Sequence, residues 1–171
     1  MKKTIILYRS KTGFSKRYAE WIAEDLGCES RPIKGMKLED LNDYTLVVYG
    51  AGIYAGMISG IGRIKNWMEK SSQKTWIVFA TGATPPDEGY EELVFKSNFR
   101  KGESRPAHFF YFLSGLNYEK MGFFNRALIK LFSGMAAKKN GTTRPVNQTS
   151  VDLANRDFIT ELLSYVRLKA K

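Results

Sequence analysis

The sequence predicts an α/β protein in which a parallel β-sheet is covered by helices on both faces. Five short segments are almost continuously apolar and rich in β-branched or aromatic residues, which is typical of strands buried on both faces. Segments with helical spacing of apolar residues alternate with them. The 171 residues contain no repeat and no linker long enough to divide them, so we expect residues 1–171 to form a single domain.

The elements follow one another in a regular order. The expected strands cover residues 4–8, 28–33, 44–50, 75–80 and 108–113. The first expected helix follows residue 15, and the others cover about 59–70, 87–95, 121–138 and 151–168. Because the strands of such a sheet run in one direction, the loops that follow them meet at its carboxyl edge, where ligands bind.

The loop after the first strand has the composition of a phosphate cradle. It offers three hydroxyls, from Ser10, Thr12 and Ser15, together with Lys11 and Gly13. A helix begins directly afterwards, and its N-terminal N–H groups and dipole favour an anion. Gly13 lets the backbone approach such a ligand without a Cβ in the way. The alternative is an ordinary strand–helix turn in which Ser15 caps the helix.

The run Ser10-Lys-Thr-Gly-Phe-Ser15 resembles the [Ser/Thr]-x-Thr-Gly-x-[Ser/Thr] phosphate loop of the flavodoxin family, at the family's position after the first strand. The resemblance implies a flavodoxin-like three-layer α/β/α sandwich with a five-stranded parallel sheet of order 2-1-3-4-5. It also implies FMN as the cofactor. Its phosphate would lie against Ser10, Lys11, Thr12, Gly13, Phe14 and Ser15.

Two further loops occupy the places where this family holds the flavin ring. The loop after the third strand is uncharged, and Tyr54 is suited to form a wall against a flat ring. The loop after the fourth strand is a Thr-Gly turn stiffened by two prolines. The resemblance assigns ring contacts to Ala51, Gly52, Ile53, Tyr54, Ala55 and Gly56, and to Thr81, Gly82, Ala83 and Thr84. A glycine turn with Tyr54 packed on its own sheet is the alternative.

Single cysteine and histidine residues exclude several classes of site. Cys28 alone cannot form an internal disulfide or a cysteine-cluster metal site, and we expect it to be buried as a small apolar residue. His108 lies in an aromatic run and is expected to pack there, which leaves a histidine zinc site or a Ser–His–Asp triad without support. We therefore expect no metal. With no apolar run of membrane-spanning length and no signal peptide, we expect a cytoplasmic protein.

The formal net charge of +10 is concentrated in one stretch. Residues 96–144 contain ten basic and two acidic residues and so carry +8 of that charge. Such a stretch suits an anionic membrane surface, an acidic substrate or nucleic acid, and dispersed surface lysines are the alternative. We expect no nucleic-acid partner, because the stretch carries no recognisable nucleic-acid-binding motif.

An amphipathic segment follows the fifth strand. Within residues 118–135, apolar residues gather in a stripe about 100° wide, and Arg126 and Lys130 lie opposite. Packing on the sheet is one explanation, and contact of segment 118–139 with an anionic membrane is the other. Gly115-Leu-Asn-Tyr118 and the helix after it resemble the corresponding part of flavodoxin-fold, menaquinone-dependent protoporphyrinogen dehydrogenases. That resemblance implies a quinone and peripheral contact at the inner face of the membrane.

The expected function is therefore an FMN oxidoreductase that passes electrons from a reduced organic substrate, such as protoporphyrinogen IX, to a quinone. The alternative is a flavodoxin-type electron carrier that docks on an acidic protein redox partner. The sequence identifies no catalytic acid or base. The expected ring loops carry no carboxylate before Asp87, so we expect a less negative two-electron potential than in acidic carrier flavodoxins.

Overall fold

A computed structural model of the chain describes residues 3–116 and 150–170. The strands are β1 (Thr4–Arg9), β2 (Glu29–Pro32), β3 (Leu46–Tyr54), β4 (Met57–Ile58), β5 (Thr75–Gly82), β6 (His108–Leu113), β7 (Gly115–Leu116) and β8 (Val151–Asp152). The helices are α1 (Phe14–Leu26), α2 (Ile61–Lys70), α3 (Tyr90–Asn98) and α5 (Thr160–Ala170), with short 3-10 helices η1 (Leu38–Leu41) and η2 (Arg156–Ile159).

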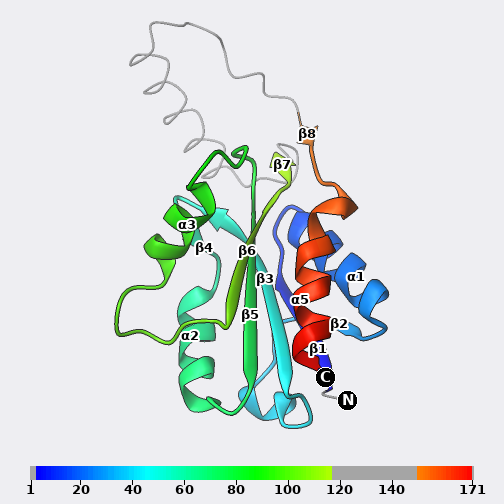
Figure 1. Cartoon of the computed structure of the whole chain (residues 1–171), viewed down its shortest axis with the longest axis vertical. Coiled ribbons are helices and arrows are strands. Elements are labelled where there is room, and N and C mark those ends of the chain that lie inside the picture. Colours follow the sequence, from blue (N-terminus) through cyan, green and yellow to red (C-terminus); the bar gives the residue numbers. More distant parts are fainter. Residues whose placement is uncertain (1–2, 117–149, 171) are drawn as a thin grey trace, which may run out of the picture.

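Five parallel strands form the centre of the molecule in the order β2-β1-β3-β5-β6. This is the expected order, and β4 adds a short antiparallel partner to the end of β3. Figure 1 shows α2 and α3 on one side of the sheet and α1 and α5 on the other. The predicted three-layer fold class is confirmed.

Each strand places alternate side chains into two separate cores, as its two-residue periodicity requires. Ile5 and Leu7 of β1 pack in the core under α2 and α3, whereas Ile6 packs in the core under α1 and α5. All three side chains are fully buried. Both faces of the central strands are thus apolar, which explains the nearly continuous apolar runs in the sequence.

The third strand is longer than predicted. The expected loop at residues 51–57 is instead the end of β3, a two-residue turn and β4, with Ala51 paired to both Arg9 and Ala80. Gly50 belongs to the strand because the Phe79 ring occupies the space over it: a Cβ there would lie 1.8 Å from Phe79 Cζ. Of the two glycines that indicated a loop, Gly52 lies within the strand under the Tyr54 ring, and Gly56 lies in the turn.

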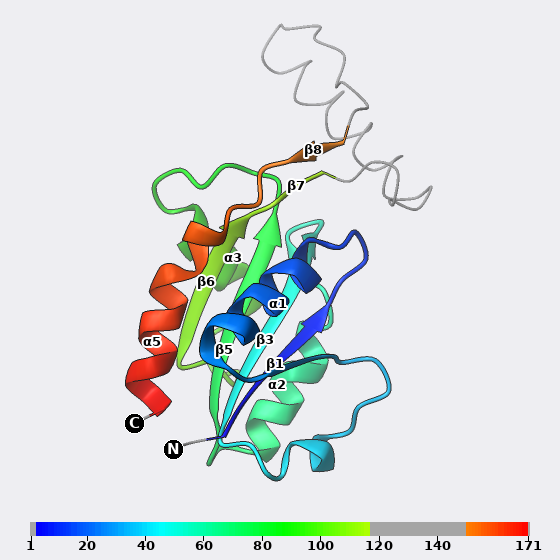
Figure 2. The same cartoon turned by 90° about the vertical axis from the view of Figure 1, so that its right-hand side faces the viewer.

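The last helix begins later than predicted. Residues 151–152 form β8, which pairs with β7, and α5 starts only at Thr160 after η2. Asn155 adopts an extended backbone and its Oδ1 accepts a hydrogen bond from the Asp157 N–H (2.9 Å), which starts η2. Figure 2 shows the β7–β8 ribbon beyond the carboxyl end of β6. The predicted 121–138 helix lies outside the described residues.

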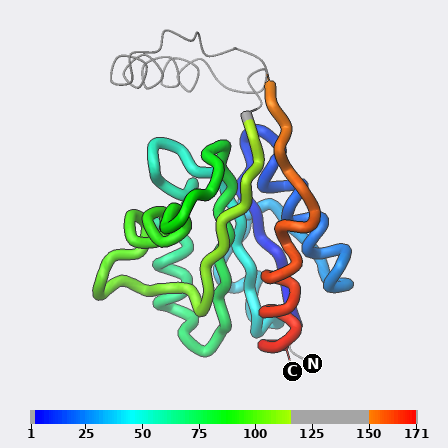
Figure 3. Tube along the Cα trace, turned by 45° about the horizontal axis from the view of Figure 1, so that its top comes forward, coloured from blue at the N-terminus to red at the C-terminus, as the bar shows by residue number. Residues whose placement is uncertain are grey.

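The C-terminal segment returns along α1. Figure 3 shows the red α5 beside the blue N-terminal part of the chain, which contains α1. The helices α1 and α5 are in contact. Arg156 forms ion pairs with Asp25 (2.8 Å) and Glu24 (3.0 Å) at the end of α1. His108 packs as predicted, with its ring 4.5 Å from Phe110 and 4.6 Å from Tyr165 between centroids.

Candidate FMN site at the carboxyl edge of the sheet

The loop between β1 and α1 forms an open helix N-terminus. Gly13 is the N-cap residue with a φ of 100°, its N–H donates to Ser10 Oγ (3.1 Å), and as a glycine it offers no side chain to cap the helix. The alternative of a Ser15 cap is therefore wrong. The first N–H groups of α1 have no acceptor within the helix. A Cβ at Gly13 would meet no described atom within 4 Å, so the described residues leave the space over the loop open.

The phosphate loop is tied to the end of β5 through Ser15. Its Oγ lies 2.8 Å from Thr81 Oγ1, and both residues are only 3% exposed. Two residues that the sequence assigned to different ligand contacts are thus bonded to each other. This buried bond fixes the spacing between the first and third predicted loops.

The expected ring wall, Tyr54, also meets the phosphate loop. Lys11 Nζ lies 4.6 Å from the centroid of the Tyr54 ring, and Thr12 forms a side-chain hydrogen bond with Tyr54. Burial raises the pKa of the Tyr54 phenol, and the Thr12 bond partly opposes that rise. The ring also lies over Gly52 of its own strand, where a Cβ would be 3.2 Å from Tyr54 Cε2. Tyr54 therefore contacts the phosphate loop and its own strand together.

The other residues of the predicted ring loops differ in their environments. Ile53 packs against the core under α2 and α3, whereas Ala55 and Gly56 are exposed at the β3–β4 turn. Thr81 and Gly82 belong to β5 rather than to a loop, because they pair with Phe112 and Leu113 of β6. Ala83 and Thr84 follow the strand, with Thr84 exposed.

Sequence reasoning missed Tyr111. Its hydroxyl donates to the Thr84 carbonyl (2.7 Å), and its ring lies 4.9 Å from that of Tyr90. Burial raises the pKa of the Tyr111 phenol, so it remains a hydrogen-bond donor at neutral pH. Alternation within β6 predicts which face this residue occupies, but its partner depends on how α3 packs.

The described strands β7 and β8 also lie at this edge. Asp152 of β8 pairs with Arg17 in the first turn of α1 (2.8 Å), and Arg17 lies over the Phe14 ring (5.3 Å). Tyr18 reinforces this connection: its hydroxyl donates to the Leu113 carbonyl (2.6 Å) and accepts from the Asn155 N–H (3.2 Å). The residues on either side of the β7–β8 pair are thus attached to the helix that follows the phosphate loop.

The described part of the chain contains neither a group of metal-ligating side chains nor a membrane-spanning helix. Residues 3–116 and 150–170 contain no group of His, Cys, Asp and Glu suited to a metal ion. Over the same residues, no helix is both long and apolar enough to cross a bilayer.

The arrangement defines an α/β protein in which the N-terminus of α1 lies beside Tyr54 at the carboxyl edge of the sheet. A family model for the flavodoxin domain matches residues 5–143, and the chain belongs to that family. The family binds FMN, so the expected cofactor is confirmed at the level of the family. No significant match was found among curated proteins.

Solved structures with a similar fold include a flavoprotein in complex with FMN from Lactobacillus acidophilus, with 19% identity and a TM-score of 0.45 over 65% of this chain and 93% of that chain. A two-electron reduced flavodoxin from Megasphaera elsdenii has 14% identity and a TM-score of 0.46 over 64% and 85%. A WrbA-like flavodoxin from Agrobacterium tumefaciens has 16% identity and a TM-score of 0.45 over 84% and 100%. These scores are low, and the family assignment depends on the family model.

Proposed function

We propose that this chain binds FMN non-covalently at the carboxyl edge of its sheet and transfers electrons through it. The observation that carries the proposal is the N-terminus of α1, where the N-cap residue Gly13 has no side chain and no described atom lies within 4 Å of the position of a Cβ. The first turn, Phe14-Ser-Lys-Arg17, carries two bases and no acid. Such a terminus suits a phosphate group.

Each part of the site has a separate task in this proposal. The phosphate lies against residues 10–15, and Lys11 adds positive charge. Because the Ser15 hydroxyl is bonded to Thr81, Ser15 contributes to the phosphate site through its backbone N–H. Tyr54 and the β3–β4 turn form a wall for the ring, and the backbone of residues 81–84 meets its pyrimidine end. Bound FMN supplies the electron-transfer chemistry, while the protein orients it and tunes its potential.

The proposed reaction takes electrons from a reduced organic substrate and delivers them to a quinone, with protoporphyrinogen IX as the substrate to test first. The uncharged β3–β4 turn supports a less negative two-electron potential than that of acidic carriers. Peripheral contact with a membrane through residues 118–139 belongs to this proposal. Of the basic stretch, Arg100, Lys101 and Arg105 lie on the α3–β6 connection, which leads into the opposite end of β6. Attraction of an acidic substrate would therefore fall to basic residues after 117.

An electron carrier is the second candidate, because flavodoxin-type proteins pass electrons to redox partners. With a net charge of +10, this chain would require a partner with an acidic face. Such a complex should weaken steeply as the salt concentration rises.

An anaerobic titration tests the two candidates. The protein is loaded with FMN, protoporphyrinogen is added, and the visible absorbance of the flavin is followed. Bleaching that a menaquinone analogue reverses supports the oxidoreductase. Tight FMN binding without bleaching excludes protoporphyrinogen and favours the carrier, and a protein that never retains FMN refutes the proposal.

Matched variants of two glycines test the site itself. Gly13→Ala and Gly102→Ala both place a side chain at a positive φ, 100° and 89°, with no described atom within 4 Å of the new Cβ. Both should lose stability through the same backbone strain. Only Gly13→Ala should weaken FMN more than riboflavin, because riboflavin lacks the phosphate. Equal loss of FMN affinity in both variants would contradict the assigned phosphate site.

A further inference from the structure

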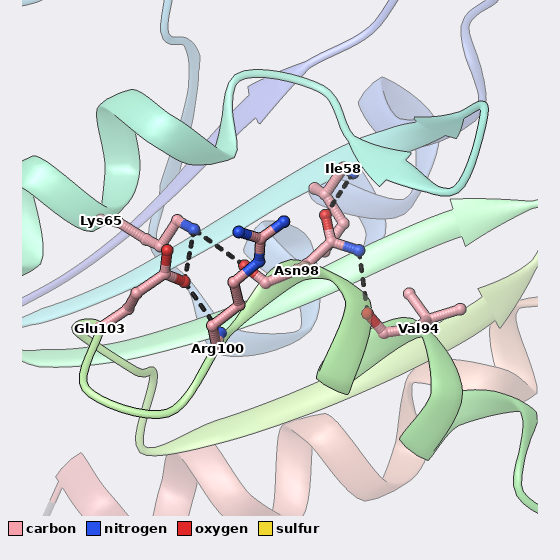
Figure 4. A network of polar contacts seen from close by, with 6 residues as sticks. All are labelled: Ile58, Lys65, Val94, Asn98, Arg100 and Glu103. Carbon is pink, nitrogen blue, oxygen red and sulfur yellow. Dashed lines mark hydrogen bonds and ion pairs between the residues drawn. The ribbon is translucent and has the colours of Figure 1, made fainter.

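A buried asparagine at the end of α3 holds the β3–β4 turn. Asn98 is 1% exposed, and its side chain makes three hydrogen bonds to backbone groups. The Ile58 N–H donates to Asn98 Oδ1 (2.8 Å), and Asn98 Nδ2 donates to the carbonyls of Gly56 (3.0 Å) and Val94 (2.9 Å). Figure 4 shows the bonds to Ile58 and Val94. Since an N–H can only donate and a carbonyl can only accept, these partners fix the orientation of the amide.

The turn that Asn98 holds has an unfavourable backbone. Ala55 and Gly56 form a two-residue connection between Tyr54 and Met57, with φ of 49° and 78°. Positive φ at both central residues is typical of the type I′ turn of hairpins. Among the described residues, Ala55 is the only non-glycine with a positive φ. Such a conformation persists only where the surroundings enforce it, and Asn98 bonds the backbone on the C-terminal side of Ala55.

Asn98 is itself held in place by a hydrogen bond from α2. Its carbonyl accepts a hydrogen bond from Lys65 Nζ of α2 (3.0 Å), and Lys65 also pairs with Glu103 (2.7 Å). Glu103 in turn accepts the Arg100 N–H (2.8 Å) just beyond α3 (Figure 4). The turn is therefore supported by α2, α3 and the α3–β6 connection, and not by strand pairing alone.

We propose that Asn98 is a positioning residue for the flavin-ring wall, because it fixes the Ala55–Gly56 turn next to Tyr54 and directs the Gly56 carbonyl towards α3. This inference rests on the proposed function. Asn98 does not touch the phosphate loop. Its loss should therefore change the ring environment and leave the phosphate contribution unchanged.

Binding of FMN and riboflavin to Asn98→Ala tests this role. Both flavins should bind about tenfold more weakly. This is the lower end of the loss in affinity that follows when the outer hydrogen-bond partner of a metal ligand is removed. The ratio of the two dissociation constants should stay as in the wild type, and the midpoint potential of bound FMN should shift. Unchanged constants and potential, or a loss confined to FMN, would overturn the inference.

Ser71→Ala serves as the matched control. Ser71 is 2% exposed, and its hydroxyl donates to the Trp67 carbonyl and accepts from Trp76 Nε1 at the end of α2. Its loss removes buried hydrogen bonds far along the sheet from the turn. Ser71→Ala should destabilise the protein without moving the potential. A shift of the same size in both variants would show that general loosening, and not Asn98, sets the ring environment.

A glycine at position 55 keeps the inference testable where Asn98→Ala folds poorly. Ala55→Gly adopts a positive φ without strain, so the turn depends less on Asn98. Adding Asn98→Ala to the Ala55→Gly protein should therefore weaken riboflavin binding by less than the loss of about tenfold expected with alanine at position 55. An equal loss of about tenfold in the Ala55→Gly protein overturns the inference. A wild-type protein that binds neither flavin refutes the proposed function itself, and with it the role of Asn98.

Discussion

The hydrogen bond between Ser15 and Thr81 should connect the stability of the phosphate loop to that of β5. The two hydroxyl oxygens are 2.8 Å apart and both residues are 3% exposed, so water cannot replace a lost partner. Ser15→Ala or Thr81→Val leaves one buried hydroxyl without this bond, which costs about 1–3 kcal/mol.

The double variant is the decisive measurement. Once one hydroxyl is gone, removing the other costs little, so we expect a coupling free energy of about 1 kcal/mol. Equilibrium urea unfolding gives the free energy of unfolding of the flavin-free wild type, the two single variants and the double variant. For a chain of this size, 1 kcal/mol corresponds to a change of about 2–4 °C in Tm, which gives an independent reading.

Ser164→Ala is the control for the Ser15 substitution. Ser164 is exposed, and its hydroxyl donates to the Thr160 carbonyl one turn earlier in α5 (3.0 Å). Its removal should change the unfolding free energy by less than about 0.5 kcal/mol, as is usual for surface positions. Additive effects of Ser15→Ala and Thr81→Val would refute the reasoning, because they would show that the two hydroxyls do not depend on each other.

Three further outcomes follow from the same structure. Tyr18→Phe removes the hydroxyl that donates to the Leu113 carbonyl and should lower the unfolding free energy by about 1–3 kcal/mol in urea titration; an unchanged midpoint would contradict this bond. Lys11→Met removes the cation beside Tyr54 and should weaken FMN about fivefold at low salt while riboflavin binding stays constant, so equal weakening of both flavins would argue against a phosphate role. Burial raises the pKa of the Cys28 thiol to about 11, so the folded protein holds the thiol neutral. Its alkylation by iodoacetamide should still accelerate about tenfold per pH unit between pH 8 and 10, and a rate that levels off near pH 9 would contradict this pKa.

The amino-acid sequence determined the layered fold and the loops that meet at the carboxyl edge of the sheet. Apolar periodicity identifies five strands, and the Ser10–Ser15 loop follows the first of them. These features are local, because each depends on residues that are neighbours in the chain. Once the strands are parallel, their carboxyl ends must share one edge, so the three ligand loops were expected to converge there.

The tertiary structure decided how these loops are built and joined. Glycine carries no side-chain signal, so Gly52 was assigned to a loop although it lies in β3, under the Tyr54 ring. The Ser15–Thr81 bond and the hold of Asn98 on the turn join residues 66 and 42 positions apart. Such contacts depend on how elements pack across the molecule, which local periodicity does not specify. The sequence therefore determines which loops meet at the carboxyl edge of the sheet, and the packing of α1, α3 and β5 determines which of their side chains are bonded to one another.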